Sequence, residues 1–239
     1  MDVISYLLGK KAGGGGGIGS IDVGSRKIKF GNSSFQTFDT TGLDFSNCTD
    51  MSNMFLGCTL LQDVPLINTS NATNMQSMFQ NCNKLKTIPL LNTSNVTNFQ
   101  TMFSNCSILQ TIPLINTSKA TTTRQMFNSC GGLKSVPLLD ISNVSDMVFM
   151  FGYCGNLETV PKFNVSKATN MQSMFQNCNK LTDESLDNIL QMCIGATSYN
   201  GIKTLKYIGI YNVTTYPTSR IEALSHYQDF VNAGWTIGY

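Results

Sequence analysis

A repeat of 24 residues runs through the middle of the chain and constrains its fold more than any other feature. The dipeptide Met-Phe recurs at this interval, and cysteine, leucine and proline follow it at fixed distances. The recurring positions are Met54, Met78, Met102, Met126, Met150 and Met174; Cys58, Cys82, Cys106, Cys130, Cys154 and Cys178; Leu61, Leu85, Leu109, Leu133, Leu157 and Leu181; and Pro65, Pro89, Pro113, Pro137 and Pro161. Residues 72–85 and 168–181 share the string ATNMQSMFQNCNKL. Units this short cannot bury an apolar face alone, so the repeat predicts a stacked solenoid.

Each unit combines two kinds of apolar spacing. The first half has helical spacing, at Met75, Met78, Phe79 and Cys82, and the second half suits a turn into a short extended segment, at Leu85, Ile88 and Leu90. Pro89 lacks an N–H and suits a strand end, while Asn92, Thr93 and Ser94 supply turn and capping chemistry. We therefore expect an α/β repeat with a buried ladder that includes Met78, Phe79, Cys82, Leu85, Met102, Phe103, Cys106 and Leu109.

The pattern Ser-Asn-Val/Ala-Thr-Asn-Met-x-x-Met-Phe-x-x-Cys-x-x-Leu-x-x-Val/Ile-Pro resembles the BspA-like leucine-rich repeats of bacterial surface proteins and of phages that infect gut bacteria. The resemblance covers residues 44–181. It implies a right-handed leucine-rich-repeat solenoid of about six units that serves adhesion or recognition. The closing string DFVNAGWTIGY also resembles the tails of phage-encoded members.

Both ends of the chain depart from the repeat. Residues 1–12 place Asp2 first and their lysines last, the reverse of a secretion signal, and Val3, Ile4, Leu7 and Leu8 have helical spacing. We expect an anchoring peptide there, a glycine-rich tether over 13–20 and an N-terminal cap over 21–43. Residues 182–239 should form a C-terminal capping module. It is expected to contain a helix from Thr182 to Gly195, a strand over 203–213, and a helix that starts at a capping box over 219–222 and runs to Gly234.

The cysteines, the histidine and the acidic pairs do not form a recognisable reactive or metal site. The eight cysteines include no CxxC pair, and buried free thiols are favoured over disulfides between neighbouring units. His226, three residues before Asp229, has no recognisable nucleophile and is expected to be a surface residue. Asp44 and Asp50, like Asp140 and Asp146, lack a calcium-loop pattern. We therefore predict that the protein is not an enzyme and holds no cofactor or metal.

The charge balance and the hydropathy of the sequence argue against nucleic acid and membrane as partners. With 16 basic and 14 acidic residues, the chain lacks the excess charge of a nucleic-acid protein that neutralises phosphates. No apolar run approaches the roughly 18 residues of a membrane-spanning helix, so no membrane insertion is expected.

Surface positions that vary between units are the candidates for ligand contact. They are Lys86, Gln110, Arg124 and Lys134, together with an apolar spot in the fifth unit formed by Val148, Phe149 and Tyr153. The spot is either a contact patch or a surface that packs on the C-terminal module or on a second copy of the chain.

These observations favour a phage virion protein of fibre, spike or capsid-decoration type, located in the virion and assembled in the host cytoplasm. Its predicted partners are a virion protein that docks residues 1–12 and a host-surface glycan or protein, and it can also form a homo-oligomer. A bacterial adhesin at the cell surface, or an intracellular interaction module, is the alternative.

Overall fold

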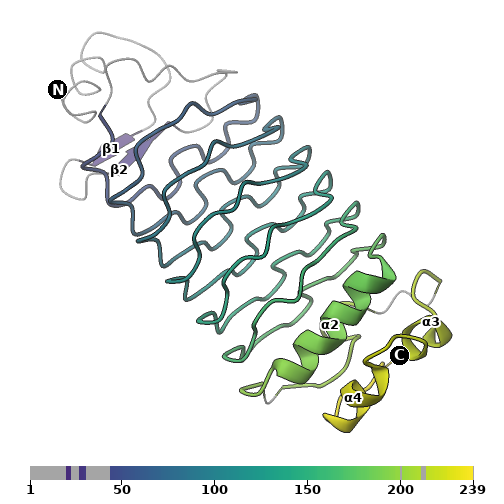
Figure 1. The fold of residues 1–239 in the computed structure, drawn as a ribbon. Helices are drawn as coiled ribbons and strands as arrows, with labels where there is room; N and C mark the ends of the chain where they lie inside the picture. The colour runs from purple at the N-terminus through teal and green to yellow at the C-terminus, as the bar shows by residue number, and fades with distance from the viewer. Residues whose placement is uncertain (1–19, 23–26, 31–43, 200, 211–213, 239) are drawn as a thin grey trace.

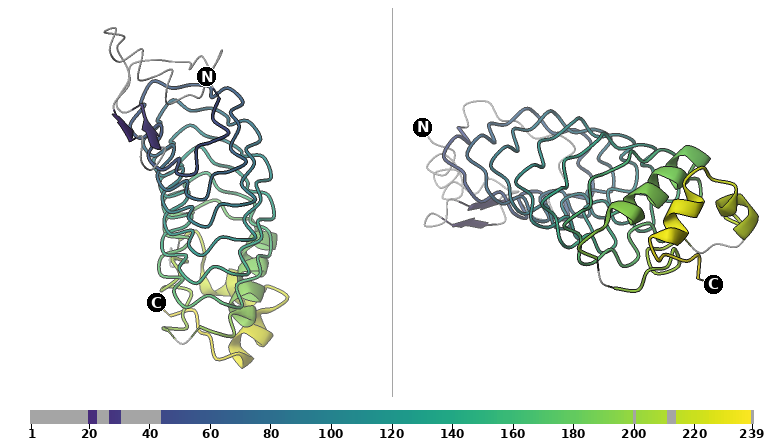
Figure 2. Two further views of the ribbon diagram at one scale, coloured as in Figure 1. Left: turned by 90° about the vertical axis from the view of Figure 1, so that its left-hand side faces the viewer. Right: turned by 60° about the horizontal axis from the view of Figure 1, so that its bottom comes forward.

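A stack of coils separates two different ends of the molecule in the computed structural model (Figure 1). The structure describes residues 20–22, 27–30, 44–199, 201–210 and 214–238. Strands β1 (Ser20–Asp22) and β2 (Lys27–Lys29) lie at one end of the stack, and helices α2 (Asp183–Gly195), α3 (Thr218–Glu222) and α4 (Tyr227–Asn232) lie at the other (Figures 1 and 2). The proposed anchoring residues Val3, Ile4, Leu7 and Leu8, and residues 13–19 of the proposed tether, lie outside the described residues.

Each coil is joined to the next by backbone hydrogen bonds between residues one repeat apart. Parallel bridges connect Asp50, Asn74, Asn98, Thr122, Asp146 and Asn170 in succession. Beside them, the N–H of Phe79 donates to the carbonyl of Met102 at 2.9 Å, and the N–H of Phe103 donates to that of Met126 at 2.9 Å. The stacked solenoid predicted from the repeat is therefore confirmed, while its handedness and the number of units stay predictions.

The helical segment predicted inside each unit is wrong. Residues 75–85 form successive turns instead, in which the N–H of Met78 donates to the carbonyl of Met75 at 3.2 Å and that of Cys82 donates to the carbonyl of Phe79 at 3.1 Å. Ser77 and Asn81 have φ values of 54° and 63°, in the left-handed region, which stops a helix from continuing. The extended parts make only single bridges between coils, so the α/β description does not hold for residues 44–181.

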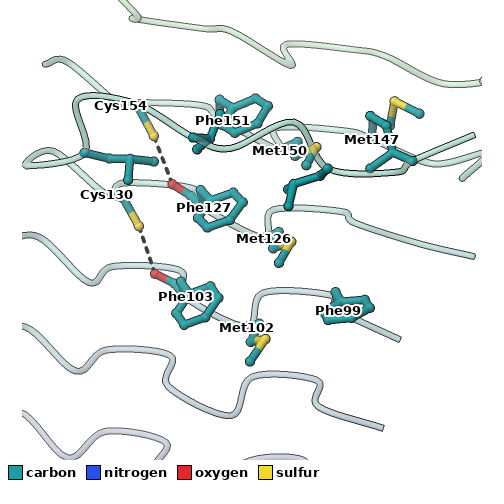
Figure 3. Close-up of a cluster of buried hydrophobic side chains, with 14 of the residues drawn as sticks. Phe99, Met102, Phe103, Met126, Phe127, Cys130, Met147, Met150, Phe151 and Cys154 are labelled. Carbon is teal, nitrogen blue, oxygen red and sulfur yellow. Dashed lines mark hydrogen bonds between the residues drawn. The ribbon is translucent and has the colours of Figure 1, made fainter. Parts of the chain in front are cut away.

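The predicted core ladder is confirmed. Its eight residues are fully buried, at 0% exposure, and belong to one continuous cluster: Met78, Phe79, Cys82, Leu85, Met102, Phe103, Cys106 and Leu109. Along the stack, the phenylalanine rings from Phe55 to Phe175 lie parallel with centroids 5.4–5.6 Å apart. Figure 3 shows part of this column beside the methionines and the cysteines. Such offset ring stacks stabilise a core beyond their buried area alone.

The described residues of the predicted N-terminal cap lie at the first coil of the stack. β1 and β2 form an antiparallel pair, and Phe30, directly after β2, is buried. Its N–H donates to the carbonyl of Met54 at 2.7 Å, and its ring stacks on Phe55 with centroids 5.3 Å apart. Phe30 thus covers the open end of the phenylalanine column.

Helix α2 covers the other end of the stack, as predicted. Its N-cap is Thr182, whose hydroxyl accepts a hydrogen bond from the N–H of Ser185 at 3.2 Å. The predicted apolar face is buried against the last coil: Leu186, Ile189, Leu190 and Cys193. None of the described helices is long and apolar enough to span a bilayer.

The rest of the C-terminal module differs from the prediction. Residues 205–209 are turns that extend the stack, because the carbonyls of Tyr207 and Ile208 accept from the N–H groups of Ser173 and Phe175. Gly209 is needed there, since it has a φ of 100° and a Cβ would lie 2.3 Å from the backbone nitrogen of Gln176.

The capping box and the single long helix predicted after it are also wrong. Helix α3 begins directly after Pro217 with no side-chain cap, so Ser219 lies inside it. Residues 223–226 interrupt the helix before α4. Trp235 then stacks on Tyr199 with centroids 5.3 Å apart and is buried.

Candidate interaction surfaces

The cysteines that recur in each unit are buried and stay protonated. All eight cysteines are buried and none forms a disulfide, which confirms the free thiols predicted from the sequence. The thiols of Cys130 and Cys154 donate to the carbonyls of Phe103 and Phe127 at 3.0 and 3.1 Å (Figure 3). Burial raises the pKa of these thiols far above the ordinary value, and the charge of the neighbouring cysteine raises it further. The thiolate needed for nucleophilic or metal-binding chemistry is therefore suppressed.

A row of leucines forms an exposed apolar stripe on the coils. It consists of Leu66, Leu90, Leu114 and Leu138, each directly after the proline of its unit and each 61–72% exposed. We call this set the leucine row. Leu90, which the apolar spacing grouped with Leu85 and Ile88, is exposed, and the next residue, Leu91, is buried instead at 2% exposure. The row ends at the fifth unit, where the equivalent residue is the exposed Lys162.

The charged and amide side chains predicted to contact a ligand fall into two groups. Lys86, Gln110 and Lys134 are exposed and stand four residues before successive members of the leucine row. The backbone N–H of Lys134 donates to the carbonyl of Gln110 at 3.1 Å, so these residues are neighbours in the stack. Arg124 belongs to another stretch of its coil, next to the bridging Thr122, and its guanidinium lies 3.4 Å from the carboxylate of Asp146. Three of the four side chains therefore belong to the same segments of the coils as the leucine row, and Arg124 does not.

The apolar spot of the fifth unit is smaller than predicted. Val148 is only 3% exposed and cannot contact a ligand, so its assignment is wrong. Phe149 is half-buried and Tyr153 is 44% exposed, and their rings are parallel with centroids 6.2 Å apart. We call Phe149 and Tyr153 the aromatic pair. The hydroxyl of Tyr153 accepts a hydrogen bond from the side-chain amide of Gln176 at 3.2 Å.

A cavity of about 370 Å³ opens where the C-terminal helices meet the fifth unit. It is lined by Lys162 from that unit, Gln191 and Ile194 from α2, and His226, Asp229 and Asn232 from the α4 region. His226 is half-buried and pairs with Asp187, whose carboxylate lies 2.6 Å from its Nδ1, instead of with Asp229. The spacing of His226 and Asp229 could not show this, because Asp187 lies 39 residues earlier in the chain.

The Asp187–His226 pair is a structural contact between α2 and the α4 region. Burial of Asp187 raises its pKa, but hydrogen bonds from the backbone and ring of His226 and from Ser225 outweigh it, so the pKa is lowered overall. The Ser225 hydroxyl lies 3.4 Å from the same ring nitrogen, Nδ1, that contacts Asp187. A hydrolytic triad needs serine and aspartate on opposite ring nitrogens, so these residues do not form one.

The remaining acidic residues noted in the sequence stabilise turns by accepting hydrogen bonds from backbone N–H groups. The carboxylates of Asp44 and Asp140 accept hydrogen bonds from the N–H groups of Ser46 and Ser142 at 2.8 and 3.1 Å. Asp50 and Asp146 act in the same way on the residue two positions later, at 2.9 and 3.1 Å. Within the part of the chain that the structure describes, no three His, Cys, Asp or Glu side chains are grouped for metal binding.

Comparison with known proteins gives one family. No protein of curated function shows a significant sequence match to the chain. A solved structure, that of a leucine-rich repeat protein from T. pallidum, is similar at 18% sequence identity with a TM-score of 0.47, covering 72% of this chain and 91% of that one. A family model described as "Mycoplasma protein of unknown function, DUF285" matches residues 26–137 and 110–201. The two matches to the family model together span most of the repeats. The chain therefore belongs to the DUF285 family.

Proposed function

We propose that the chain is a non-catalytic interaction or adhesion module that binds a protein partner through the leucine row. One observation carries this proposal: four leucines at one position of successive units are 61–72% exposed, although the adjacent leucine or isoleucine of the same unit is buried. A contiguous apolar stripe of this kind, flanked by polar side chains, is typical of a binding surface.

The spacing of the leucine row favours a helical segment of the partner. The coils stack with ring centroids 5.4–5.6 Å apart, so successive leucines are one coil apart along the same direction. An α-helix has a pitch of about 5.4 Å, so apolar residues three or four apart along a helix recur at the same interval. An amphipathic helix that lies along the stack can therefore contact every leucine in register. Lys86, Gln110 and Lys134 would lie along its polar edge.

The location predicted from the sequence, a phage particle, is part of the same proposal. A phage particle that displays the coils toward a host-surface glycan or protein is supported by the resemblance of the repeats and of the C-terminal string to phage-encoded members. A bacterial cell surface or an intracellular complex fits the same leucine row. Detection of the chain in purified virions would support the first setting, and surface labelling of intact bacteria would support the second.

The test of the binding face uses two libraries, one displayed on a helical scaffold and one of extended peptides. We expect helical binders with apolar residues three or four apart to be enriched on the intact protein. Their affinity should fall at least tenfold for the double variant Leu90→Asn/Leu114→Asn. The control variant Ile202→Asn changes an equally exposed apolar residue in the C-terminal module and should bind normally. Binders that ignore the double substitution, or an enrichment of extended peptides alone, would refute the proposal.

A further inference from the structure

The fifth unit differs from the other units at a cluster of adjacent surface positions. Where the second unit carries Ser77 and Asn81, and the sixth unit carries Ser173 and Asn177, the fifth unit carries Phe149 and Tyr153. Between these two aromatic residues, Gly152 replaces a larger residue, which is Leu56 in the first unit and the polar Gln80, Ser104, Asn128 or Gln176 in the others. Three substitutions in a single coil thus create the aromatic pair.

The aromatic pair occupies backbone positions that do not suit aromatic residues. Phe149 and Tyr153 have φ values of 54° and 62°, in the left-handed region. The equivalent residues of the other units have the same conformation but are Ser, Thr, Asn or Gln, or, at Gly57 of the first unit, glycine. Asparagine in particular tolerates this conformation, whereas a bulky residue is a true outlier there. Local strain of this kind often accompanies a functional site, because selection for stability alone would favour the residues of the other units.

Gly152 is the residue that makes room for the Phe149 ring. A Cβ at position 152 would lie 2.7 Å from Cδ1 of Phe149 and 3.0 Å from the side-chain oxygen of Asn128. The ring therefore covers the backbone of Gly152 and lies parallel to Tyr153, with centroids 6.2 Å apart. The hydrogen bond from the Gln176 side chain to the Tyr153 hydroxyl fixes the second ring. Glycine, phenylalanine and tyrosine thus form one platform with a defined geometry.

The surroundings of the aromatic pair indicate an uncharged ligand. The residues joined to this segment by backbone hydrogen bonds carry amide and hydroxyl side chains. The N–H groups of Phe149 and Tyr153 donate to the carbonyls of Gln172 and Gln176, and the N–H of Ser129 donates to the carbonyl of Gly152. Asp146, three residues before Phe149, is paired with Arg124 of the preceding unit at 3.4 Å, so these two charges offset each other. The face of an aromatic ring carries partial negative charge and attracts weakly positive C–H groups. A pyranose ring presents such a C–H face on one side and hydroxyls at its edge, and the hydroxyls can pair with the neighbouring amides.

We propose that Phe149 and Tyr153 form a stacking platform for a neutral pyranose residue of a glycan. Tyr153, which is 44% exposed, contacts the sugar directly, while Gln172 and Ser129 bind hydroxyls at the edge of the sugar. This site is independent of the leucine row, which lies on another stretch of the coils. Glycan binding to the platform and helix binding to the leucine row can therefore be tested separately, and a negative result for one does not bear on the other.

The test follows the ring resonances of Phe149 and Tyr153 by NMR while methyl glycosides of glucose, galactose, mannose and N-acetylglucosamine are added at millimolar concentration. We expect at least one sugar to shift both rings and to receive saturation transfer from them. The double variant Phe149→Ser/Tyr153→Asn restores the residues of neighbouring units and should bind that sugar at least tenfold more weakly. This variant should be no less stable than the parent, so its loss of binding cannot be attributed to unfolding.

Two further variants complete the test. Tyr153→Phe keeps the ring and should retain most of the binding, and Ile202→Ser, an exposed apolar residue outside the platform, should bind as the parent does. The proposal is refuted if none of the four sugars shifts the rings, or if the double variant binds them equally well. It is also refuted if the rings respond only to an arginine-rich or aromatic peptide, which would make the platform a protein contact.

Discussion

The thiol of Cys130 donates a hydrogen bond to the carbonyl oxygen of Phe103, 3.0 Å away in the adjacent coil, and Cys82, Cys106, Cys154 and Cys178 repeat this contact. The column of cysteines therefore links coils by side-chain hydrogen bonds in addition to the backbone bonds. It also removes the thiols from solvent.

No cysteine of the folded protein should react with a disulfide reagent near neutral pH. Burial raises every thiol pKa that is shifted, to about 12 for Cys178, so the reactive thiolate is almost absent below that pH. Titration with a chromogenic disulfide in native buffer should give no rapid reaction, and all eight thiols should react after denaturation. Rapid modification of even one thiol in the native protein would contradict the structure.

Adjacent leucines should respond very differently to truncation. Leu91→Ala removes a buried side chain and should lower the free energy of unfolding by about 2–5 kcal/mol. Leu90→Ala removes an exposed side chain and should change it by less than about 0.5 kcal/mol. Urea unfolding of the two variants provides the comparison. Similar losses at both positions would show that the leucine row is part of the core.

Gly152→Ala should destabilise the protein because the new Cβ would lie 2.7 Å from the Phe149 ring. The matched control is Gly155→Ala, where a Cβ would meet nothing within 4 Å. Combining Gly152→Ala with Phe149→Ser should recover most of the loss, because the substitution removes the clashing ring. A double-mutant cycle measures this coupling. Additive effects of the two substitutions would mean that Phe149 does not cover Gly152.

The Asp187–His226 contact should contribute to stability in a pH-dependent way. The pKa of Asp187 in the folded protein lies below its ordinary value of 3.8, so its contribution is complete above that pH and is lost as the pH falls through the lower folded value. Asp187→Asn should therefore lower the unfolding temperature at neutral pH, and the difference from the parent should shrink in strong acid. A control, Asp229→Asn, changes an exposed carboxylate three residues after His226 that is not the partner of its ring. A constant difference across the pH range for Asp187→Asn would contradict this account.

The sequence predicted the core well because identical positions in every unit must share one environment. Repetition identified Met78, Phe79 and Cys82 as buried without any knowledge of the backbone between them. Helix α2 was also predictable, since its N-cap, acidic first turn and apolar face agree with one another.

Other features depended on backbone geometry or on distant contacts. Both Leu90 and Leu91 are apolar, and strand alternation favours Leu90, but the buried residues of this segment, Leu85, Ile88 and Leu91, occur at every third position. Helical spacing at Met75 and Met78 did not reveal the left-handed residue between them, Ser77. The partner of His226 could not be predicted because α2 and the α4 region come together only in the folded chain.

The regular contact from each cysteine to the preceding phenylalanine also has a consequence for how such a protein can change over generations. Every internal coil presents a phenylalanine carbonyl as acceptor to one neighbouring coil and a cysteine thiol as donor to the other. An in-frame duplication of one unit therefore inserts a coil that can make both hydrogen bonds. The number of units in the stack can therefore change while both ends stay intact. Substitutions such as those at Phe149 are what distinguish one unit from the others.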